Sequence, residues 1–261
     1  MAQIQCNFFS YALGHGVDIA VTLPSFTSCN MDQEHTHQLP AKFPVLYLLH
    51  GHGNDYMVWH RYTSIDRYAE ERRIAVVTFS VGNKAYVNAG LGDNFYDFLE
   101  QELPQFVENY FPISNKPEDR YIGGLSMGGY GSLIHGLQNP ERYSAIGAFS
   151  PGIFTQEELD QGRTDMPTAS MVDCYAAVKE AIASGKKLPD LFLCIGDKDF
   201  LYEKVTKFHG FLEPIWKGSR LRYDDLPGYE HEFAIWDREV QEFLDWIDRK
   251  DVYQAMGRNK V

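Results

Sequence analysis

The chain has 261 residues, of which 44% are hydrophobic and 23% are charged, and its formal net charge is −12. These proportions are those of a globular protein, so they exclude a disordered or fibrous chain. The acidic balance disfavours nucleic acid and anionic membranes as partners, because a negative surface repels phosphate groups.

The N-terminal residues predict a β-hairpin. Residues 4–11 and 17–23 have the composition of strands, and a glycine-containing turn at residues 14–16 joins them. Residues 25–42 are polar and irregular, so a surface loop is expected there. No signal-peptide pattern opens the sequence, and no apolar stretch approaches the ~20 residues that cross a bilayer. A cytoplasmic protein without a membrane partner is therefore expected.

Short apolar runs, each ending in glycine or a small polar residue, recur along the rest of the chain. They cover residues 45–49, 74–79, 121–123, 145–149, 191–195 and 221–226. Continuous apolar runs predict strands that are buried on both faces, as in a parallel sheet covered by helices. Helical patterns at residues 62–71 and 95–110 lie between the runs, and an amphipathic helix is expected at residues 237–249.

This alternation of strands and helices predicts a single α/β domain over residues 1–261. Right-handed crossovers would wind the elements into a mostly parallel central sheet with helices on both faces and an N-terminal antiparallel hairpin. Residues 153–187 interrupt the alternation and are a candidate for a small cap insertion over the carboxyl edge of the sheet.

The sequence Gly-Leu-Ser-Met-Gly at residues 124–128 fits the G-x-S-x-G nucleophile elbow. Such a serine occupies a sharp turn between a strand and a helix, and its small neighbours let the helix pack closely against the strand. Here the motif follows an apolar run and precedes a helix-compatible segment. Ser126 is therefore the predicted nucleophile, with an ordinary glycine-rich turn as the alternative.

A serine hydroxyl needs a base within hydrogen-bond reach, and on this kind of sheet the order along the chain is serine, acid, histidine. His135 and His209 lie in predicted helices, whereas His231 follows Pro-Gly in the loop after the last strand. His231 is therefore the predicted base. Asp199 is preferred over Asp197 as the acid, because two further residues let the loop turn toward the histidine.

Two backbone N–H groups are expected to stabilise the oxyanion, those of Met127 and His52, with Gly53 as the alternative to His52. The side chains of His50 and His52 also suggest a metal site, but no third ligand is evident, so no metal is expected. Three aromatic residues follow strand ends and are candidates for the substrate pocket, with buried aromatic core as the equal alternative for each: Trp59, Tyr86 and Phe200.

Over nearly its whole length the chain resembles the esterase D family of α/β-hydrolases, in particular its tributyrin-esterase-like members, which are related to S-formylglutathione hydrolase. The matching segments are PVLYLLHG at 44–51, ELP at 102–104, YFP at 110–112, GLSMGGYG at 124–131, GDKDFLY at 196–202 and GYEHE at 228–232. The resemblance implies cofactor-free hydrolysis of short-chain acyl esters by a homo-oligomer, with Ser126, Asp199 and His231 as the triad. The alternatives are an acyltransferase or thioesterase with the same triad, or a feruloyl or acetyl-xylan esterase. The intact triad disfavours a non-catalytic binding protein.

Overall fold

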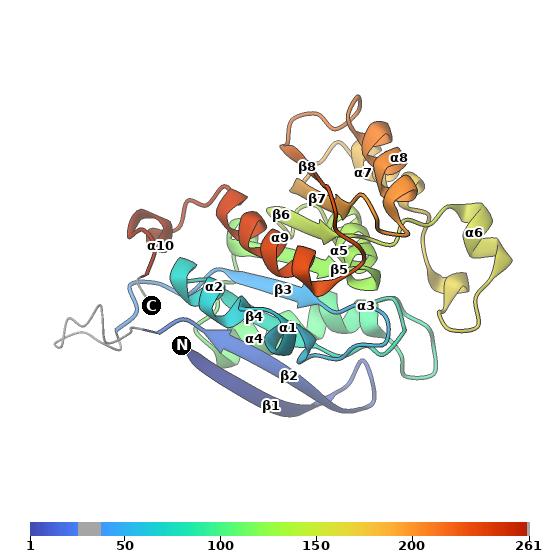
Figure 1. Ribbon diagram of the computed structural model, residues 1–261. Coiled ribbons are helices and arrows are strands. Elements are labelled where there is room, and N and C mark those ends of the chain that lie inside the picture. The colour runs from blue at the N-terminus through green and yellow to red at the C-terminus, as the bar shows by residue number, and fades with distance from the viewer. Residues whose placement is uncertain (26–37, 260–261) are drawn as a thin grey trace.

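The computed structural model describes residues 1–25 and 38–259, so most of the loop predicted at 25–42 lies outside the described residues (Figure 1). Within them the chain forms one sheet of eight strands in the order β1-β2-β4-β3-β5-β6-β7-β8. The strands are β1 Ala2–Ser10, β2 His15–Leu23, β3 Val45–Leu49, β4 Ala75–Phe79, β5 Arg120–Leu125, β6 Ala145–Phe149, β7 Asp190–Gly196 and β8 Leu221–Leu226.

The N-terminal hairpin and the mostly parallel sheet are both confirmed. β1 and β2 pair antiparallel from Ala2 opposite Leu23 to Ser10 opposite His15, and β2 pairs antiparallel with β4. All other neighbouring strands run parallel. The carboxyl ends of the parallel strands therefore meet at one edge of the sheet, where the loops with the predicted functional residues begin.

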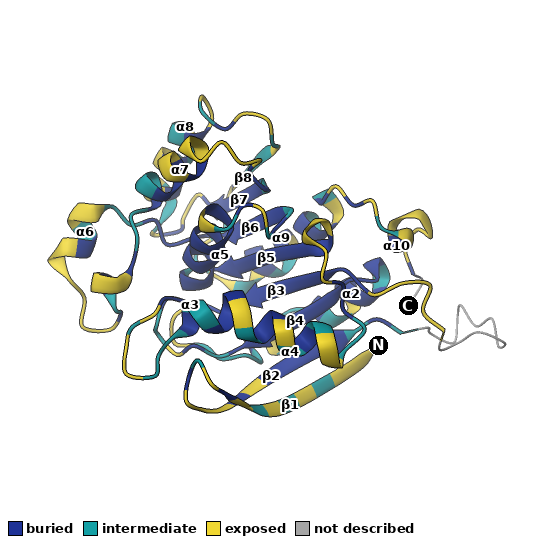
Figure 2. Cartoon of the chain, turned by 180° about the vertical axis from the view of Figure 1, so that it is seen from behind, coloured by how far each residue is buried: buried dark blue, intermediate teal, exposed yellow. Residues whose placement is uncertain are grey.

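Helices cover both faces of the sheet, as predicted. They are α1 Val58–Tyr62, α2 Ile65–Arg72, α3 Phe95–Asp97, α4 Leu103–Tyr110, α5 Met127–Gln138, α6 Gln156–Gln161, α7 Cys174–Ala183, α8 Tyr202–Leu212, α9 Phe233–Trp246 and α10 Val252–Ala255. Helices α1, α2 and α9 lie on the face shown in Figure 1, and α4, α5, α7 and α8 lie on the face shown in Figure 2. No described helix combines the length and apolar character that crossing a membrane requires.

Three predicted helices differ in detail. The helix expected at 62–71 corresponds to α2, which begins only at Ile65, because the Thr63 hydroxyl donates to the Trp59 carbonyl and accepts from the Ile65 amide. The helix expected at 95–110 contains a π-helical turn over Phe98–Glu102. Helix α9 begins before residue 237, because Trp236 and its neighbours add a buried first turn.

The candidate cap at residues 153–187 divides into two parts. Helix α7 packs against α5 and so belongs to the helical layer on that face of the sheet. Helix α6 projects beyond the carboxyl edge (Figure 1), and Thr155 and Glu158 form a capping box at its start. The residues around α6 are therefore the part of this segment that remains a candidate cap.

The exposure of strand β8 contradicts one prediction. Residues 221–226 were expected to be buried on both faces, but most of β8 is half-exposed because it is the edge strand. Between β8 and α9, the Glu239 side chain is fully buried. Arg238 Nε lies 3.2 Å from Oε1, and the Asp224 carboxylate can accept a hydrogen bond from the Glu239 carboxyl when Glu239 is protonated. Burial and the nearby Asp224 carboxylate raise the pKa of Glu239 to about 8.

Because of Glu239, we expect the free energy of unfolding to fall as the pH rises. The pKa is raised from 4.5 in the unfolded chain to about 8 in the folded protein, so between these values the folded state holds the extra proton. The stabilisation by this proton is complete below pH 4.5 and is lost as the pH rises through about 8. The free energy of unfolding falls in this range by at most about 1.4 kcal/mol per pH unit. Urea denaturation at several pH values will measure it.

The Glu239→Gln variant should lack this pH dependence and should gain stability relative to the wild type as the pH rises. Glu242→Gln, on the same helix but more exposed, is the matched control: it removes an ion pair with Arg222, so its curve should be displaced but keep the wild-type pH dependence. An identical pH dependence in wild type and Glu239→Gln would show that this carboxyl does not titrate in that range.

Candidate active site

Ser126 lies between the last residue of β5 and the first residue of α5. Its backbone has φ 55° and ψ −114°, a conformation that is costly for a residue other than glycine. Main-chain hydrogen bonds hold it there: the Ser126 amide donates to the Phe149 carbonyl at 2.9 Å, and its carbonyl accepts from the amides of Tyr130 at 3.0 Å and Gly152 at 2.9 Å. Neighbouring elements therefore enforce the sharp turn that presents the hydroxyl.

The glycines of the motif are required by close packing around this turn. A Cβ atom added at Gly124 would lie 2.4 Å from the Gly128 carbonyl oxygen. One added at Gly128 would lie 2.5 Å from the Leu49 carbonyl oxygen. Helix α5 thus approaches β5 and β3 at a distance that leaves no room for a side chain.

Asp199 and His231 are brought together from the loops that follow β7 and β8. His231 Nδ1 lies 2.8 Å from Asp199 Oδ2, and the other carboxylate oxygen of Asp199 accepts from the Leu201 amide at 2.9 Å. Asp199 is buried. Asp197 is exposed and accepts from the Gly228 amide at 2.7 Å, so it holds the loop of His231 rather than its ring.

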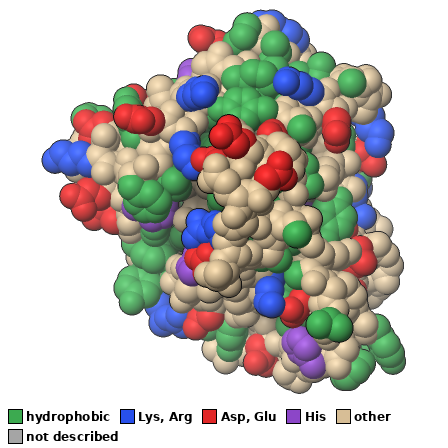
Figure 3. Space-filling view, turned by 90° about the vertical axis from the view of Figure 1, so that its right-hand side faces the viewer, with side chains coloured by type: hydrophobic (Ala, Val, Ile, Leu, Met, Phe, Trp, Pro, Cys, Tyr) green, Lys and Arg blue, Asp and Glu red, His purple; other side chains and the backbone are tan. Residues whose placement is uncertain are grey.

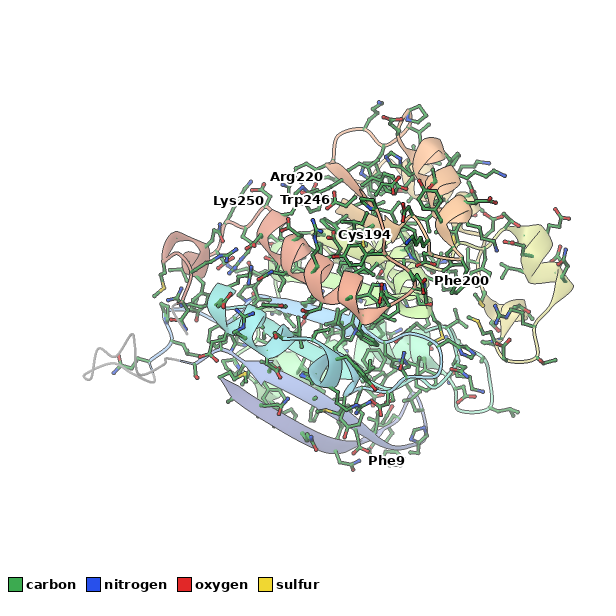
Figure 4. All side chains as sticks on the ribbon, in the orientation of Figure 1. Phe9, Cys194, Phe200, Arg220, Trp246 and Lys250 are labelled. Atoms are coloured by element: carbon green, nitrogen blue, oxygen red, sulfur yellow. The ribbon has the colours of Figure 1, made fainter. Side chains whose placement is uncertain are left out.

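Two aromatic side chains contact the imidazole ring of His231. The Phe200 ring centroid lies 4.6 Å away, and its side chain is 76% exposed at the carboxyl edge of the sheet (Figure 4). The Trp236 ring lies 4.9 Å away and, unlike Phe200, is buried, in the first turn of α9. Trp236 was missed by sequence analysis, because the helix was expected to start only at residue 237.

Trp59 and Tyr86 are placed in the core, as in the alternative interpretation, and both are fully buried. Trp59 Nε1 donates to the Leu49 carbonyl at 3.0 Å, and the Tyr86 hydroxyl donates to the His50 carbonyl at 2.8 Å. Both side chains therefore hold the main chain at the end of β3. Of the three predicted pocket residues, Phe200 is the one that lies at the surface beside His231.

The turn after β3 lies beside the serine, since a Cβ atom added at Gly51 would be 3.4 Å from Ser126 Cβ. In this turn the Gly53 amide already donates to Asn83 Oδ1 at 2.8 Å. Within the described part of the chain, no protein acceptor is assigned to the amides of His52 and Met127. The Gly53 amide therefore already has a hydrogen-bond partner, which the His52 amide lacks among the described residues.

The side chains of the two histidines in this turn have different surroundings. His50 is buried, its Nδ1 donates to the Gly51 carbonyl at 2.7 Å, and its Nε2 accepts from the Val81 amide at 3.0 Å. Burial lowers its pKa, so the ring stays neutral and both nitrogens are engaged. His52 is partly exposed, and its Nε2 lies 3.2 Å from Asp165 Oδ2 in the segment that follows α6.

Comparison with known proteins shows similarity over nearly the whole chain. The model of the family described as "Putative esterase" matches residues 10–249. An acetyl esterase from Caldicellulosiruptor saccharolyticus is 26% identical, over 95% of this chain and 99% of that protein.

Two solved structures from Staphylococcus aureus are also similar. The fluorophosphonate-binding serine hydrolase FphF has a TM-score of 0.82 and 29% identity, over 95% of this chain and 99% of its own. The S-formylglutathione hydrolase FrmB has a TM-score of 0.79 and 30% identity, over 94% of this chain and 98% of its own. With the eight-stranded sheet and its helical layers, these matches show that the chain belongs to the esterase family, has the α/β-hydrolase fold and is a carboxylic ester hydrolase.

Proposed function

We propose that the enzyme is a serine carboxylesterase for short-chain acyl esters, with Ser126 as nucleophile, His231 as base and Asp199 as acid. The observation that carries the proposal is the 2.8 Å contact between His231 Nδ1 and Asp199 Oδ2, at the same edge of the sheet as the strained turn of Ser126. Because Nδ1 is held by the carboxylate, Nε2 is the nitrogen that remains for the serine hydroxyl. The acetyl esterase relative supports a short acyl group.

In the acylation half of the reaction, Ser126 Oγ forms a bond to the ester carbonyl carbon while its proton passes to His231 Nε2. The former carbonyl oxygen, now negatively charged, accepts hydrogen bonds from the amides of His52 and Met127. The intermediate then breaks the bond to the alcohol oxygen, which takes the proton from Nε2 and leaves as the free alcohol. Asp199 stabilises the imidazolium that exists between the two proton transfers.

Deacylation repeats these steps with water. His231 Nε2 accepts a proton from water as its oxygen bonds to the acyl carbon, and the same two amides receive the oxyanion. The bond to Ser126 Oγ then breaks, and the serine recovers its proton from Nε2. The products are the carboxylic acid and the unchanged enzyme.

Two exposed features lie beside the candidate site: Phe200 contacts His231, and the residues after α6 contact His52. The exposed Phe200 ring lies against His231, the residue that protonates the leaving alcohol, so it is the candidate contact for that group. His52 Nε2 lies 3.2 Å from Asp165 Oδ2. Figure 3 shows this end of the molecule, where acidic and basic side chains are interspersed with hydrophobic ones.

The proposal is tested by measuring kcat/KM for p-nitrophenyl acetate, butyrate and octanoate and for methyl ferulate. We expect acetate and butyrate to be the best substrates. Higher kcat/KM for octanoate or methyl ferulate would contradict the short-chain assignment and, in the second case, favour a feruloyl esterase.

A thioesterase is the second candidate, because the FrmB structure at 30% identity is an S-formylglutathione hydrolase. It uses the same atoms, with a thiolate as the leaving group. Adding S-formylglutathione to the substrate panel separates the two functions. A kcat/KM for the thioester far above that for p-nitrophenyl acetate would make the enzyme a thioesterase.

We also propose that the protein is a homo-oligomer that acts in the cytoplasm on a small ester. The oligomer rests on the family resemblance, and the compartment is supported by three free thiols in the described residues: Cys6, Cys174 and Cys194. Light scattering on purified enzyme tests the assembly. A mass equal to one chain would contradict it.

A further inference from the structure

The Asp199 hydrogen bond holds the His231 ring at Nδ1, but hydrogen bonds tolerate a range of angles, so the ring can still tilt while the bond is kept. Trp236 supplies a second constraint. Its ring lies 4.9 Å from the imidazole at an interplanar angle of 84°, the edge-to-face arrangement that aromatic pairs favour. Trp236 is 4% exposed, so the surrounding core holds its ring in place. Phe200, which also contacts the imidazole, is largely exposed to solvent.

The indole is itself held in place, because Trp236 Nε1 donates a hydrogen bond to Ser150 Oγ at 3.1 Å. Ser150 follows β6 directly, is fully buried and has φ 43°, in the left-handed region. Its amide donates to the Cys194 carbonyl at 2.9 Å, which fixes the residue to the end of β7. A strained, buried serine thus presents its hydroxyl to the tryptophan.

The same short segment also binds the nucleophile. Two residues after Ser150, the Gly152 amide donates to the Ser126 carbonyl at 2.9 Å, and just before it the Phe149 carbonyl accepts from the Ser126 amide. The turn of Ser126 and the indole of Trp236 are therefore both hydrogen-bonded to residues 149–152. This links the position of the nucleophile to that of the ring beside His231.

We propose that Ser150 and Trp236 are positioning residues, which set the tilt of the His231 imidazole so that Nε2 faces Ser126 and the leaving oxygen. The inference rests on the proposed triad. Neither residue reacts with the ester. Their effect is on the proton transfers, because these depend steeply on the distance and direction between Nε2 and the oxygen it serves.

Two acetate esters with different leaving groups test this role. Ethoxide is a poor leaving group and requires the proton from His231, whereas p-nitrophenolate leaves with little help. In Trp236→Phe, which keeps an aromatic ring but loses the N–H, we expect kcat/KM to fall about tenfold for ethyl acetate and less than about threefold for p-nitrophenyl acetate. Ser150→Ala should show the same preference. Both substitutions remove the same hydrogen bond, that between Trp236 and Ser150. The double variant should therefore lose no more activity than the more impaired of the two single variants.

The matched control is Trp246→Phe in the last turn of α9, far from Phe200 in Figure 4, where the ring packs against Phe192. It should leave the ratio of the two kcat/KM values at the wild-type level. Equal losses on both esters in Trp236→Phe and Ser150→Ala, with a matching fall in the sites titrated by a fluorophosphonate, would indicate less folded enzyme and overturn the positioning role, as would no loss. Ser150→Ala also keeps the test decisive if Trp236→Phe does not fold.

The Ser126→Ala variant separates this inference from the proposed function. An inactive Ser126→Ala enzyme, with Trp236→Phe indistinguishable from wild type, would overturn the positioning role and leave the triad in place. An active Ser126→Ala enzyme would remove the triad, and with it the basis for positioning His231.

Discussion

Replacing Ser126 with alanine is expected to lower kcat for p-nitrophenyl acetate by about 10⁴–10⁶-fold, because no other group can form the acyl-enzyme. The backbone of the turn should survive the change. Its φ of 55° is held by hydrogen bonds to Phe149, Tyr130 and Gly152 that do not involve the hydroxyl. Steady-state kinetics, with circular dichroism to verify folding, measures the loss. A fluorophosphonate probe should label the wild type and not the variant.

Ser144→Ala is the control for this experiment. Ser144 precedes β6, at the opposite edge of the sheet, and its hydroxyl donates to the main-chain carbonyls of Glu118 and Arg120. Its activity and labelling should equal those of the wild type. A folded Ser126→Ala enzyme that keeps more than about a hundredth of wild-type kcat would rule out Ser126 as the nucleophile.

Replacing Asp199 with asparagine is expected to lower kcat by about 10²–10⁴-fold through the tautomer of His231. One carboxylate oxygen accepts from the Leu201 amide and the other faces His231 Nδ1 at 2.8 Å. In an asparagine the carbonyl oxygen would stay with the Leu201 N–H, so its NH₂ group would face Nδ1. Nδ1 would then become the acceptor and Nε2 would carry the proton, so the ring could no longer accept the proton of Ser126.

Asp197→Asn is the matched control, because it makes the same chemical change two residues earlier. The Asp197 carboxylate accepts one hydrogen bond from the Gly228 amide, which an asparagine oxygen can also accept. We expect kcat to change by less than about threefold. If the two variants lost activity equally, the loss would reflect the loop and not the tautomer of His231.

Much of the fold was predictable from the sequence because the relevant signals are local. Buried parallel strands are continuous apolar runs, and the run at 45–49 became β3 within the same bounds. The motif around Ser126 has glycines where the structure leaves no room for a Cβ atom. The two further residues after the strand favoured Asp199 over Asp197, and Asp199 is the aspartate that contacts the histidine. In each case a few neighbouring residues carry the information.

Other features were decided only by the tertiary structure. Trp59, Tyr86 and Phe200 all follow strand ends, yet two are fully buried and one is exposed, because each depends on which loop covers it. The edge position of β8 depends on the strand order, and the pairing of Trp236 with Ser150 joins residues 86 positions apart. The crossovers of the sheet bring such partners together, and periodicity along the chain records burial but not the identity of the distant neighbour.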